Sequence, residues 1–514
     1  MINLESYVCG QWRAGSGEPR LLYNPATEET MAGSDSTGID FAAAVSHARD
    51  VGGPALRELG FAQRAALLKQ VSAAIYELRE DLIDLSISNG GNTRGDAKFD
   101  IDGATATLSA YAAFGKGLGD GNQMPDGDGV QLGRTARFWG QHHWVTRPGV
   151  TVHINAFNFP CWGMGEKLAQ AILAGVPVIT KPGTPTALLA WRMAQIIVDS
   201  KLLPEGSLQF IAGGTGDLLA QLGPQDSLSF TGSSGTGAQL KATANLVKDN
   251  VRVGIEADSL NAAILGPDVD EDDEIYEQFF GNLVTDITQK AGQKCTAVRR
   301  ILVPAQRAAV VAEELAARLQ AIKIGNPADK DVRLGPVASA RQLGDVRGGI
   351  EALAAAGNFA CGGSEPVFDQ GYFVSPTLLV AEDPSADVIH DTEVFGPVAS
   401  ILPYSDTQPM IDLCNRGGGS LVASIYSNDA RWTEDVVLGL SPWHGRIWIG
   451  SDKTAGQAIP PGAVMAQMVH GGPGRAGGGE ELGGLRGLAF YMQRTAIQGF
   501  QGLVARQFGT REAE

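Results

Sequence analysis

From Gly149 onwards, the chain alternates between short apolar segments typical of buried strands and longer segments with apolar residues at helical spacing. The strand-like segments are TVHINAF, VPVITK, LQFIA, SLSF and VRVGI. Between the first two lies EKLAQAILAG, a predicted helix that Gly175 should close, and the next helix should have Thr184 as its N-cap and Pro185 at its first position. Such alternation with short turns predicts an α/β fold with a parallel, doubly wound sheet.

The same pattern divides the 514 residues into regions, and a chain of this length is expected to form two or three domains. Residues 1–130 have an extended start followed by helical spacing, and they should join residues 149–255 in the first α/β unit. A second α/β unit is expected over residues 256–465. Residues 131–148 and 487–508 interrupt the pattern with aromatic and β-branched residues, which predicts an extended arm.

Composition excludes several classes of function. The formal net charge is −17, which argues against nucleic-acid binding because phosphate contacts need a basic face. The chain contains no run of eighteen apolar residues, and MINLESYVCG does not resemble a secretory leader, so neither a membrane protein nor a secreted one is expected. The five cysteines are far apart and form no CxxC pair, which favours a reducing cytoplasm over a disulfide framework or a zinc site.

One cysteine, Cys295, lies in the segment ITQKAGQKCTAVRR among amide and basic side chains. A free cysteine is most often a small buried hydrophobe. The neighbouring Lys294 and an adjacent helix end would, however, lower the pKa of the thiol and make it reactive. Cys295 is therefore a candidate nucleophile.

Two polar residues follow predicted strands and are candidates for the same chemistry. Asn158, in INAFNFP, lies in a strand-to-helix turn, where it would be either a local cap or an oxyanion donor. Glu256 ends the apolar strand VRVGI, so burial is expected to raise its pKa toward the range of a general base. A salt-bridged structural glutamate is the alternative.

Features suited to a dinucleotide also follow strands. Lys181 ends VPVITK at the sheet edge where ligands bind in open α/β folds, although a surface lysine would look the same. The turn FTGSSGTG contains Gly232, Ser233 and Gly237 and opens a helix, an arrangement that holds phosphate through backbone N–H groups. An unliganded tight turn would explain it almost as well.

The seven histidines indicate no metal site. The pair His142 and His143 falls in the predicted arm without a third ligand at metal spacing, so a surface position is expected for it. We therefore predict no bound metal.

Taken together, the motifs NAFNFP, ITKPGT, FTGSSGTG, GIEADSLN, GQKCTA and EVFGP occur in an order and spacing that resemble the aldehyde dehydrogenase superfamily nearly end to end. The forms EADSLN, AGQKCTAVRR and HGGPGRAGGGEELGGLRG look like a subfamily that acts on acyl-CoA semialdehydes in bacterial aromatic-acid degradation. Some of its members carry an extra hydratase domain. A chain of 514 residues is expected to match the stand-alone members instead.

The resemblance implies a fold and a set of roles. It implies a Rossmann-like cofactor domain (1–130 and 149–255), an α/β catalytic domain (256–465) and a small β oligomerisation arm (131–148 and 487–508). The implied catalytic residues are Cys295 as nucleophile, Asn158 as oxyanion donor, Glu256 as the base that activates water, and Lys167 and Glu481 as a proton relay.

For the cofactor, the resemblance implies that Glu393 and Phe395 contact the nicotinamide ribose and ring, and that Lys181 and Ser233 meet the adenine ribose and pyrophosphate. Many NAD-using members have a glutamate three residues after the lysine. Here that residue is Thr184, which removes a charge that would repel a 2′-phosphate. NADP is therefore the expected cofactor, with NAD as a poorer alternative.

The expected reaction is the oxidation of a CoA-linked semialdehyde to its acid in aerobic benzoate degradation. The alternatives are a CoA-acylating enzyme and a broad-specificity medium-chain aldehyde dehydrogenase. CoA-acylating relatives generally lack the general base, so Glu256 favours hydrolysis. Unpaired arm edges predict a homo-oligomer, with a dimer favoured over a tetramer.

Overall fold

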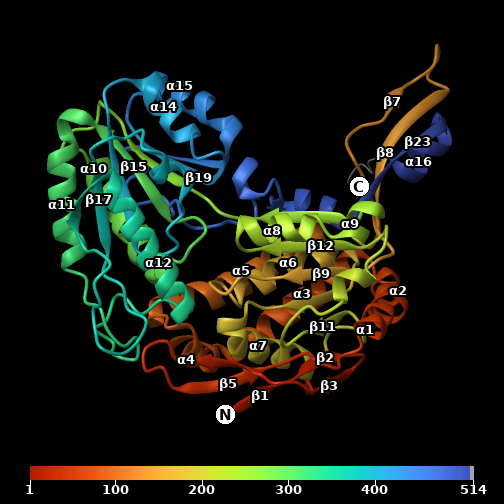
Figure 1. The fold of residues 1–514 in the computed structure, drawn as a ribbon. Helices are drawn as coiled ribbons and strands as arrows, with labels where there is room; N and C mark the ends of the chain where they lie inside the picture. The colour runs from red at the N-terminus through yellow and green to blue at the C-terminus, as the bar shows by residue number, and fades with distance from the viewer. Residues whose placement is uncertain (510–514) are drawn as a thin grey trace.

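The computed structural model describes residues 1–509 and contains two large sheets and a smaller one that projects from the body (Figure 1). The first sheet has seven strands in the order β13-β12-β9-β10-β11-β2-β3. The five central strands are all parallel, which confirms the predicted doubly wound sheet. Its strands are β2 (Ser6–Val8), β3 (Gln11–Arg13), β9 (Thr151–Ile154), β10 (Val178–Lys181), β11 (Leu208–Phe210), β12 (Ser227–Thr231) and β13 (Arg252–Glu256).

Helices cover both faces of this sheet. One face packs against a cluster of buried apolar side chains from α3, α5, α6 and α7, and the other against α1 and α9. The helices of this unit are α1 (Phe41–His47), α2 (Gly53–Arg57), α3 (Phe61–Glu77), α4 (Arg79–Gly90), α5 (Arg94–Leu118), α6 (Trp162–Ala174), α7 (Ala187–Asp199), α8 (Ser234–Lys241) and α9 (Ala244–Lys248). Beside it, β1 (Ile2–Leu4), β5 (Thr30–Ser34) and β4 (Arg20–Tyr23) form a three-stranded sheet.

Of the two predicted helix ends, the end of α6 is confirmed and the start of α7 is wrong. Gly175 closes α6 in the left-handed conformation with φ 87°, as expected for a glycine C-cap. The predicted cap at Thr184 is wrong, because residues Thr184–Thr186 form a 3-10 turn, η2, and α7 begins only at Ala187. The hydroxyl of Thr186 donates to the Phe157 carbonyl, 2.7 Å away, instead of capping the helix.

The second sheet also has seven strands, in the order β16-β17-β18-β15-β14-β19-β20, and all but β16 run parallel. Its strands are β14 (Asn261–Leu265), β15 (Val298–Pro304), β16 (Gly357–Cys361), β17 (Thr377–Ala381), β18 (Val398–Tyr404), β19 (Ser420–Tyr426) and β20 (His444–Gly450). Its helices are α10 (Glu274–Thr288), α11 (Ala308–Gln320), α12 (Ala340–Leu353), α13 (Asp387–Asp391), α14 (Thr407–Asn415) and α15 (Ala430–Leu440). Two apolar clusters, one on each face, form its core.

The arm is a four-stranded antiparallel sheet built on β8 (Phe138–Thr146) and β23 (Met492–Phe500), which pair along nine residues each. It begins earlier in the chain than expected, because β6 (Gln123–Pro125) and β7 (Val130–Gln131) also pair with β8. The helix α16 (Gln501–Phe508) follows β23. The division of the chain into the three predicted domains stays a prediction.

One histidine of the arm is placed differently from expectation. His142 is exposed, but His143 is buried, and its ring contacts the Phe508 ring and carbonyl. The two side chains differ because they point to opposite faces of β8, and α16 covers one of these faces. None of the helices within residues 1–509 is long and apolar enough to cross a membrane.

Candidate active site

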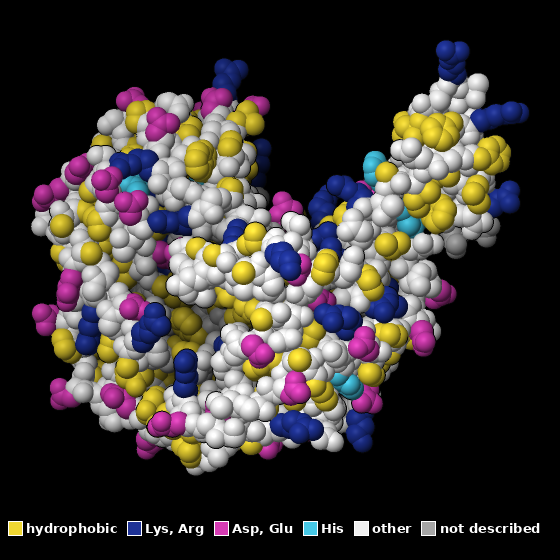
Figure 2. Space-filling view, turned by 45° about the vertical axis from the view of Figure 1, so that its right-hand side comes forward, with side chains coloured by type: hydrophobic (Ala, Val, Ile, Leu, Met, Phe, Trp, Pro, Cys, Tyr) yellow, Lys and Arg dark blue, Asp and Glu magenta, His cyan; other side chains and the backbone are white. Residues whose placement is uncertain are grey.

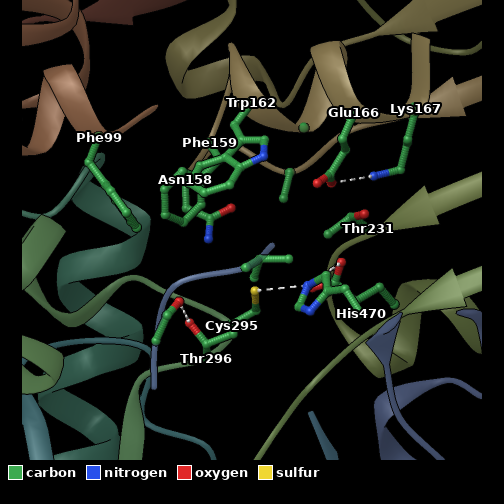
Figure 3. Close-up of a pocket in the computed structure, with 15 residues that line it drawn as sticks. Phe99, Asn158, Phe159, Trp162, Glu166, Lys167, Thr231, Cys295, Thr296 and His470 are labelled. Atoms are coloured by element: carbon green, nitrogen blue, oxygen red, sulfur yellow. Dashed lines mark hydrogen bonds and ion pairs between the residues drawn. The ribbon is translucent and has the colours of Figure 1, made fainter. Parts of the chain in front are cut away.

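A pocket with an empty volume of about 510 Å³ lies where strand ends of the first sheet face the loop before β15 of the second (Figure 3). β9 leads to Asn158, β12 ends at Thr231 and β13 ends at Glu256, so one sheet edge supplies three lining residues. Cys295 comes from the loop that precedes β15. Phe99, Phe159, Trp162 and Val464 make much of the remaining wall apolar.

The loop that carries Cys295 has an uncommon backbone. After α10, Lys290, Ala291 and Gly292 all have positive φ, at 55°, 52° and 68°. A positive φ is unfavourable for residues other than glycine, and such a backbone conformation persists only where surrounding contacts stabilise it. The buried Arg299 guanidinium does so by donating to the carbonyls of Gly292 and Gly396, at 2.8 Å and 2.7 Å.

Further hydrogen bonds fix Cys295 and the residue that follows it, Thr296. The Asn261 amide donates to the carbonyl of Cys295 at 2.7 Å, and the Thr296 hydroxyl donates to the Gly462 carbonyl at 2.8 Å. Both contacts are within hydrogen-bonding distance and leave the side chain of Cys295 directed into the pocket (Figure 3). The sulfur is thus presented from a rigid loop.

The expected activation of the thiol by Lys294 is wrong. Lys294 is buried and its ammonium donates to the carboxylate of Asp286 at 2.8 Å and to the amide oxygen of Gln289 at 3.0 Å. The ammonium therefore donates its hydrogen bonds to Asp286 and Gln289 and not to the sulfur of Cys295. Burial, followed by the negative charge of Glu256, instead raises the pKa of the Cys295 thiol well above its usual value.

Asn158 lies in the turn after β9, with its side chain buried against the cysteine loop. Its amide nitrogen donates one hydrogen bond to the Gln293 carbonyl at 3.0 Å. An amide nitrogen carries two N–H groups, so the second remains able to donate to an oxygen in the pocket. The structure therefore brings Asn158 and Cys295 together as the sequence predicted.

Glu256 also reaches the pocket, but its predicted pKa shift has the wrong direction. Burial alone would raise the pKa of this carboxyl, yet the His470 imidazole lies 3.2 Å from Oε2 and holds the pKa below its ordinary range. Burial lowers the pKa of His470, but the carboxylates of Glu256, Glu166 and Glu481 together raise it above its ordinary value. Glu256 and His470 form a buried pair that is ionic when His470 is protonated.

Sequence reasoning missed His470. It lies on β21 (Val469–Gly471), which pairs with β22 (Glu480–Leu482), and its Nε2 is 3.8 Å from Cys295 Sγ. A carboxylate oxygen of Glu256, the sulfur of Cys295 and a ring nitrogen of His470 all lie within 4.8 Å of one another. The uncommon HGGPG segment was the available signal, but the separation of 175 positions between His470 and Cys295 concealed the contact.

A second buried charge cluster borders the first. The Lys167 ammonium, from α6, lies 3.5 Å from Glu166 and 3.2 Å from Glu481, and Ser229 donates to Glu481 at 3.0 Å. Burial would lower the pKa of Lys167, but the adjacent carboxylates raise it. Burial raises the pKa of Glu166 to about 8; the Lys167 ammonium opposes this increase, and the carboxylates of Glu481 and Glu256 add to it. Lys167 and Glu481 are thus in direct contact, as the predicted relay requires.

The glycine turn after β12 fits a close-approaching ligand. Ser233 caps α8, and its side chain accepts from the Thr236 amide. A Cβ on Gly232 would lie 2.5 Å from the Phe230 ring, and one on Gly237 would lie 3.1 Å from Ile255. Only glycine fits at Gly232 without a rearrangement, so the backbone of the turn can approach a diphosphate closely. The first amide of α8, that of Ser234, donates to Asp258 Oδ1 at 2.9 Å.

The other predicted cofactor residues come from three places: Lys181 ends β10, Thr184 lies in η2, and Glu393 lies between α13 and β18. Lys181 donates to the Pro182 carbonyl at 2.8 Å, and burial, with a smaller effect of Arg20, lowers its pKa to about 8. Thr184 is half-buried in η2, against which β4 packs. Glu393 accepts from the Ser259 amide at 3.1 Å, and burial raises its pKa to about 7.

Glu393 shows best that these residues suit a dinucleotide. Within residues 1–509 its Oε1 is buried without a hydrogen bond, since Arg299 Nε is 3.8 Å away. A ribose hydroxyl is the kind of donor that such an oxygen requires. The Phe395 ring lies beside it, 6.0 Å from the Phe157 ring, and offers an apolar surface for a flat group.

Comparison with known proteins agrees with this geometry. The sequence model of the aldehyde dehydrogenase family matches residues 12–497. Over 479 residues the chain is 42% identical to 3,4-dehydroadipyl-CoA semialdehyde dehydrogenase from Aromatoleum evansii, covering 92% of this chain and 93% of that protein. Lactaldehyde dehydrogenase from Escherichia coli has a TM-score of 0.85 at 25% identity, over 97% of this chain and 99% of that one. The NAD+ complex of a Bacillus cereus aldehyde dehydrogenase has the same fold, with a TM-score of 0.85 at 23% identity over 97% and 96%.

The doubly wound sheet and the thiol pocket beside it thus define an NAD(P)-dependent oxidoreductase that acts on aldehydes. The chain belongs to the aldehyde dehydrogenase family, and it has that family's fold.

Proposed function

We propose that this protein oxidises a CoA-linked semialdehyde, 3,4-dehydroadipyl-CoA semialdehyde, to the carboxylic acid in aerobic benzoate degradation. The observation that carries the hydrolytic oxidation is the convergence of Cys295, Asn158 and Glu256 on one pocket. The substrate is proposed from the 42% identity to the Aromatoleum evansii protein, which extends over nearly all of both chains. The cytoplasm suits a reaction that needs a reduced cysteine.

Each catalytic residue has a role that its position supports. Cys295 attacks the aldehyde carbon, and the resulting oxyanion accepts hydrogen bonds from the free N–H of Asn158 and the backbone N–H of Cys295. A bound nicotinamide supplies the hydride acceptor. Loss of hydride from the thiohemiacetal leaves a thioester on Cys295, and Glu256 takes a proton from the water that hydrolyses it. Lys167 and Glu481 carry that proton onward.

The cofactor would be held along the edge of the first sheet. Lys181 and Thr184 would face the adenine ribose, and the glycine turn with Gly232, Ser233 and Gly237 the diphosphate. Glu393 and Phe395 would hold the nicotinamide ribose and ring.

The hydrolytic outcome distinguishes this proposal from a CoA-acylating enzyme. We expect a CoA-linked C6 semialdehyde and NADP+ to give the free carboxylic acid, with a rate that added CoA leaves unchanged, because Glu256 provides a base for water. Mass spectrometry of the product in 18O-labelled water should show one solvent oxygen. A strict need for free CoA, with a thioester as product, would contradict the proposal.

We expect a preference for NADP+ over NAD+ in kcat/KM. Position 184 carries a threonine in place of a carboxylate. Arg20 and Lys181 together make this end of the sheet positive. Thr184→Glu should lower the ratio of kcat/KM for NADP+ to that for NAD+ by about tenfold or more, equivalent to about 1.4 kcal/mol per factor of ten. Thr184→Gln, of the same size without the charge, should retain the preference. A clear NAD+ preference in the unmodified enzyme would contradict the assignment.

The same ratio should depend on pH. Burial lowers the pKa of Lys181 to about 8, so its ammonium is present below that pH and is lost above it. A 2′-phosphate needs this charge, whereas a ribose hydroxyl does not. From about pH 7 to about pH 9 the ratio should therefore fall by about tenfold, since kcat/KM reports groups of the free enzyme. Groups at the thiol affect both cofactors and cancel. Lys181→Met should make the ratio independent of pH.

We further propose that the arm joins two copies of the chain as a homodimer. β23 is an edge strand of the arm sheet, and an unpaired edge offers backbone groups to another chain. Figure 2 shows apolar side chains gathered on the projecting arm, where Phe138, Phe500 and Leu503 are 47%, 62% and 58% exposed. Light scattering on the purified protein distinguishes a dimer from a tetramer.

A further inference from the structure

His470 occupies a position between two reacting groups. A single nitrogen, Nε2, lies 3.2 Å from the Oε2 of Glu256 and 3.8 Å from the Sγ of Cys295 (Figure 3). The side chain is 4% exposed, and β21 holds it opposite Glu481 in the pairing with β22. A Cβ on Gly471 would lie 2.0 Å from the Gly479 carbonyl oxygen, so only glycine allows the backbone beside His470 to pack this closely.

The thiol needs a cation that its sequence neighbours do not supply. It must lose a proton to become a nucleophile, yet burial and the charge of Glu256 oppose this loss. Lys294 is engaged by Asp286. Within residues 1–509, His470 is the one group with a nitrogen at hydrogen-bonding distance from Sγ.

The groups around His470 favour its charged form. Glu256 faces it from the end of β13, Glu166 from α6 and Glu481 from β22, and all three raise its pKa against the effect of burial. Lys167, also on α6, is the opposing cation, but its ammonium is paired with Glu166 and Glu481. When protonated, His470 directs one Nε2–H at two acceptors, the Glu256 carboxylate and the Cys295 sulfur.

We propose that His470 is a catalytic residue whose imidazolium Nε2–H pairs alternately with the Glu256 carboxylate and the Cys295 thiolate. When the thiol S–H bond breaks, the proton is released to water in the pocket, and Glu256 stays ionised. The Nε2–H then donates to the sulfur, which has become negative, and the positive imidazolium offsets the new charge in the buried cluster. The same contact stabilises the thiolate when it leaves during thioester hydrolysis.

This inference rests on the proposed role of Cys295 as nucleophile, but its test needs neither aldehyde nor cofactor. The rate at which iodoacetamide alkylates the full-length enzyme is followed against pH, with peptide mass spectrometry to confirm labelling at Cys295. His470→Asn and His470→Gln should slow alkylation near neutral pH by about tenfold and move its midpoint to higher pH by about one unit. Free imidazole should restore the rate in His470→Ala.

Two comparisons separate this role from a structural one. Glu256→Gln should accelerate alkylation near neutral pH, because the amide no longer competes as strongly for Nε2–H and no longer opposes the thiolate. His444→Asn alters a buried histidine that does not line the pocket and should leave the profile unchanged. Unchanged alkylation in the folded His470 variants, or slowing by Glu256→Gln as well, would overturn the proposal. If the His470 variants do not fold, the sign of the Glu256→Gln effect decides it.

A negative result would leave the proposed function intact. Oxidation of the CoA-linked semialdehyde is measured separately by product and cofactor, and it does not require His470 to carry the charge. Conversely, the alkylation profile stands even if the substrate proves to be a free aldehyde.

Discussion

Cys295→Ala is expected to lower kcat by about four orders of magnitude or more, the scale on which loss of a covalent nucleophile acts in other enzymes. Alanine cannot form the bond to the aldehyde carbon, so no thiohemiacetal is available to lose hydride. The pocket should otherwise keep its shape, because the hydrogen bonds that hold the loop involve the backbone carbonyl of Cys295 and the side chain of Thr296. Cofactor reduction followed by absorbance measures the loss.

The control for this variant is Cys9→Ala. Cys9 is a partly exposed thiol in the turn between β2 and β3, and its contact with Gln209 is made by the backbone N–H. Its removal should leave kcat unchanged. Protein thermal unfolding and cofactor binding should be unaltered in both variants. Substantial turnover by Cys295→Ala would mean that another group forms the covalent intermediate, or that none is formed.

Glu256→Gln is expected to separate the two halves of the reaction. The thiol remains able to attack, so a rapid burst of about one reduced cofactor per active site should precede a steady rate lowered by about 10²- to 10⁴-fold, the usual contribution of a general base. The thioester should then accumulate, because glutamine cannot take a proton from water. Stopped-flow absorbance gives the burst, and intact-protein mass spectrometry should show the acyl adduct.

Glu480→Gln is the matched control, since Glu480 neighbours Glu481 on β22 but is exposed. Glu480→Gln should show no burst and the same steady-state rate as the unmodified enzyme. Adding CoA to the stalled Glu256→Gln enzyme tests for a latent acyltransfer route by release of acyl-CoA. If Glu256→Gln shows no burst and no adduct, the carboxylate acts before hydride leaves and not on the water.

Much of the architecture follows from local pattern. Strands β9 to β13 are short apolar segments between helices with regular apolar spacing, and parallel pairing is the arrangement that this alternation permits. The edge strands could not be predicted in this way. Tyr7 on β2 pairs antiparallel with Phe210, about two hundred positions later, and no local pattern encodes a contact at that separation.

In the candidate site, too, local sequence predicts some features, and contacts between distant segments determine the others. Asn158, Glu256 and Cys295 could be identified because each follows or precedes a strand whose end is determined by the fold. Their electrostatics could not be deduced, because the deciding partners come from elsewhere. Asp286 on α10 takes Lys294 away from the sulfur, and His470 on β21 reverses the expected pKa shift of Glu256.

The substrate is the central claim, and the comparison of kcat/KM between a CoA-linked C6 semialdehyde and free linear aldehydes of similar chain length, with NADP+ as cofactor, tests it most directly. If CoA supplies binding energy that is used in the transition state, the CoA-linked substrate should have the higher kcat/KM by about 10²-fold or more, equivalent to about 2.7 kcal/mol. Equal kcat/KM values for the two kinds of substrate would contradict it and would indicate a broad-specificity aldehyde dehydrogenase.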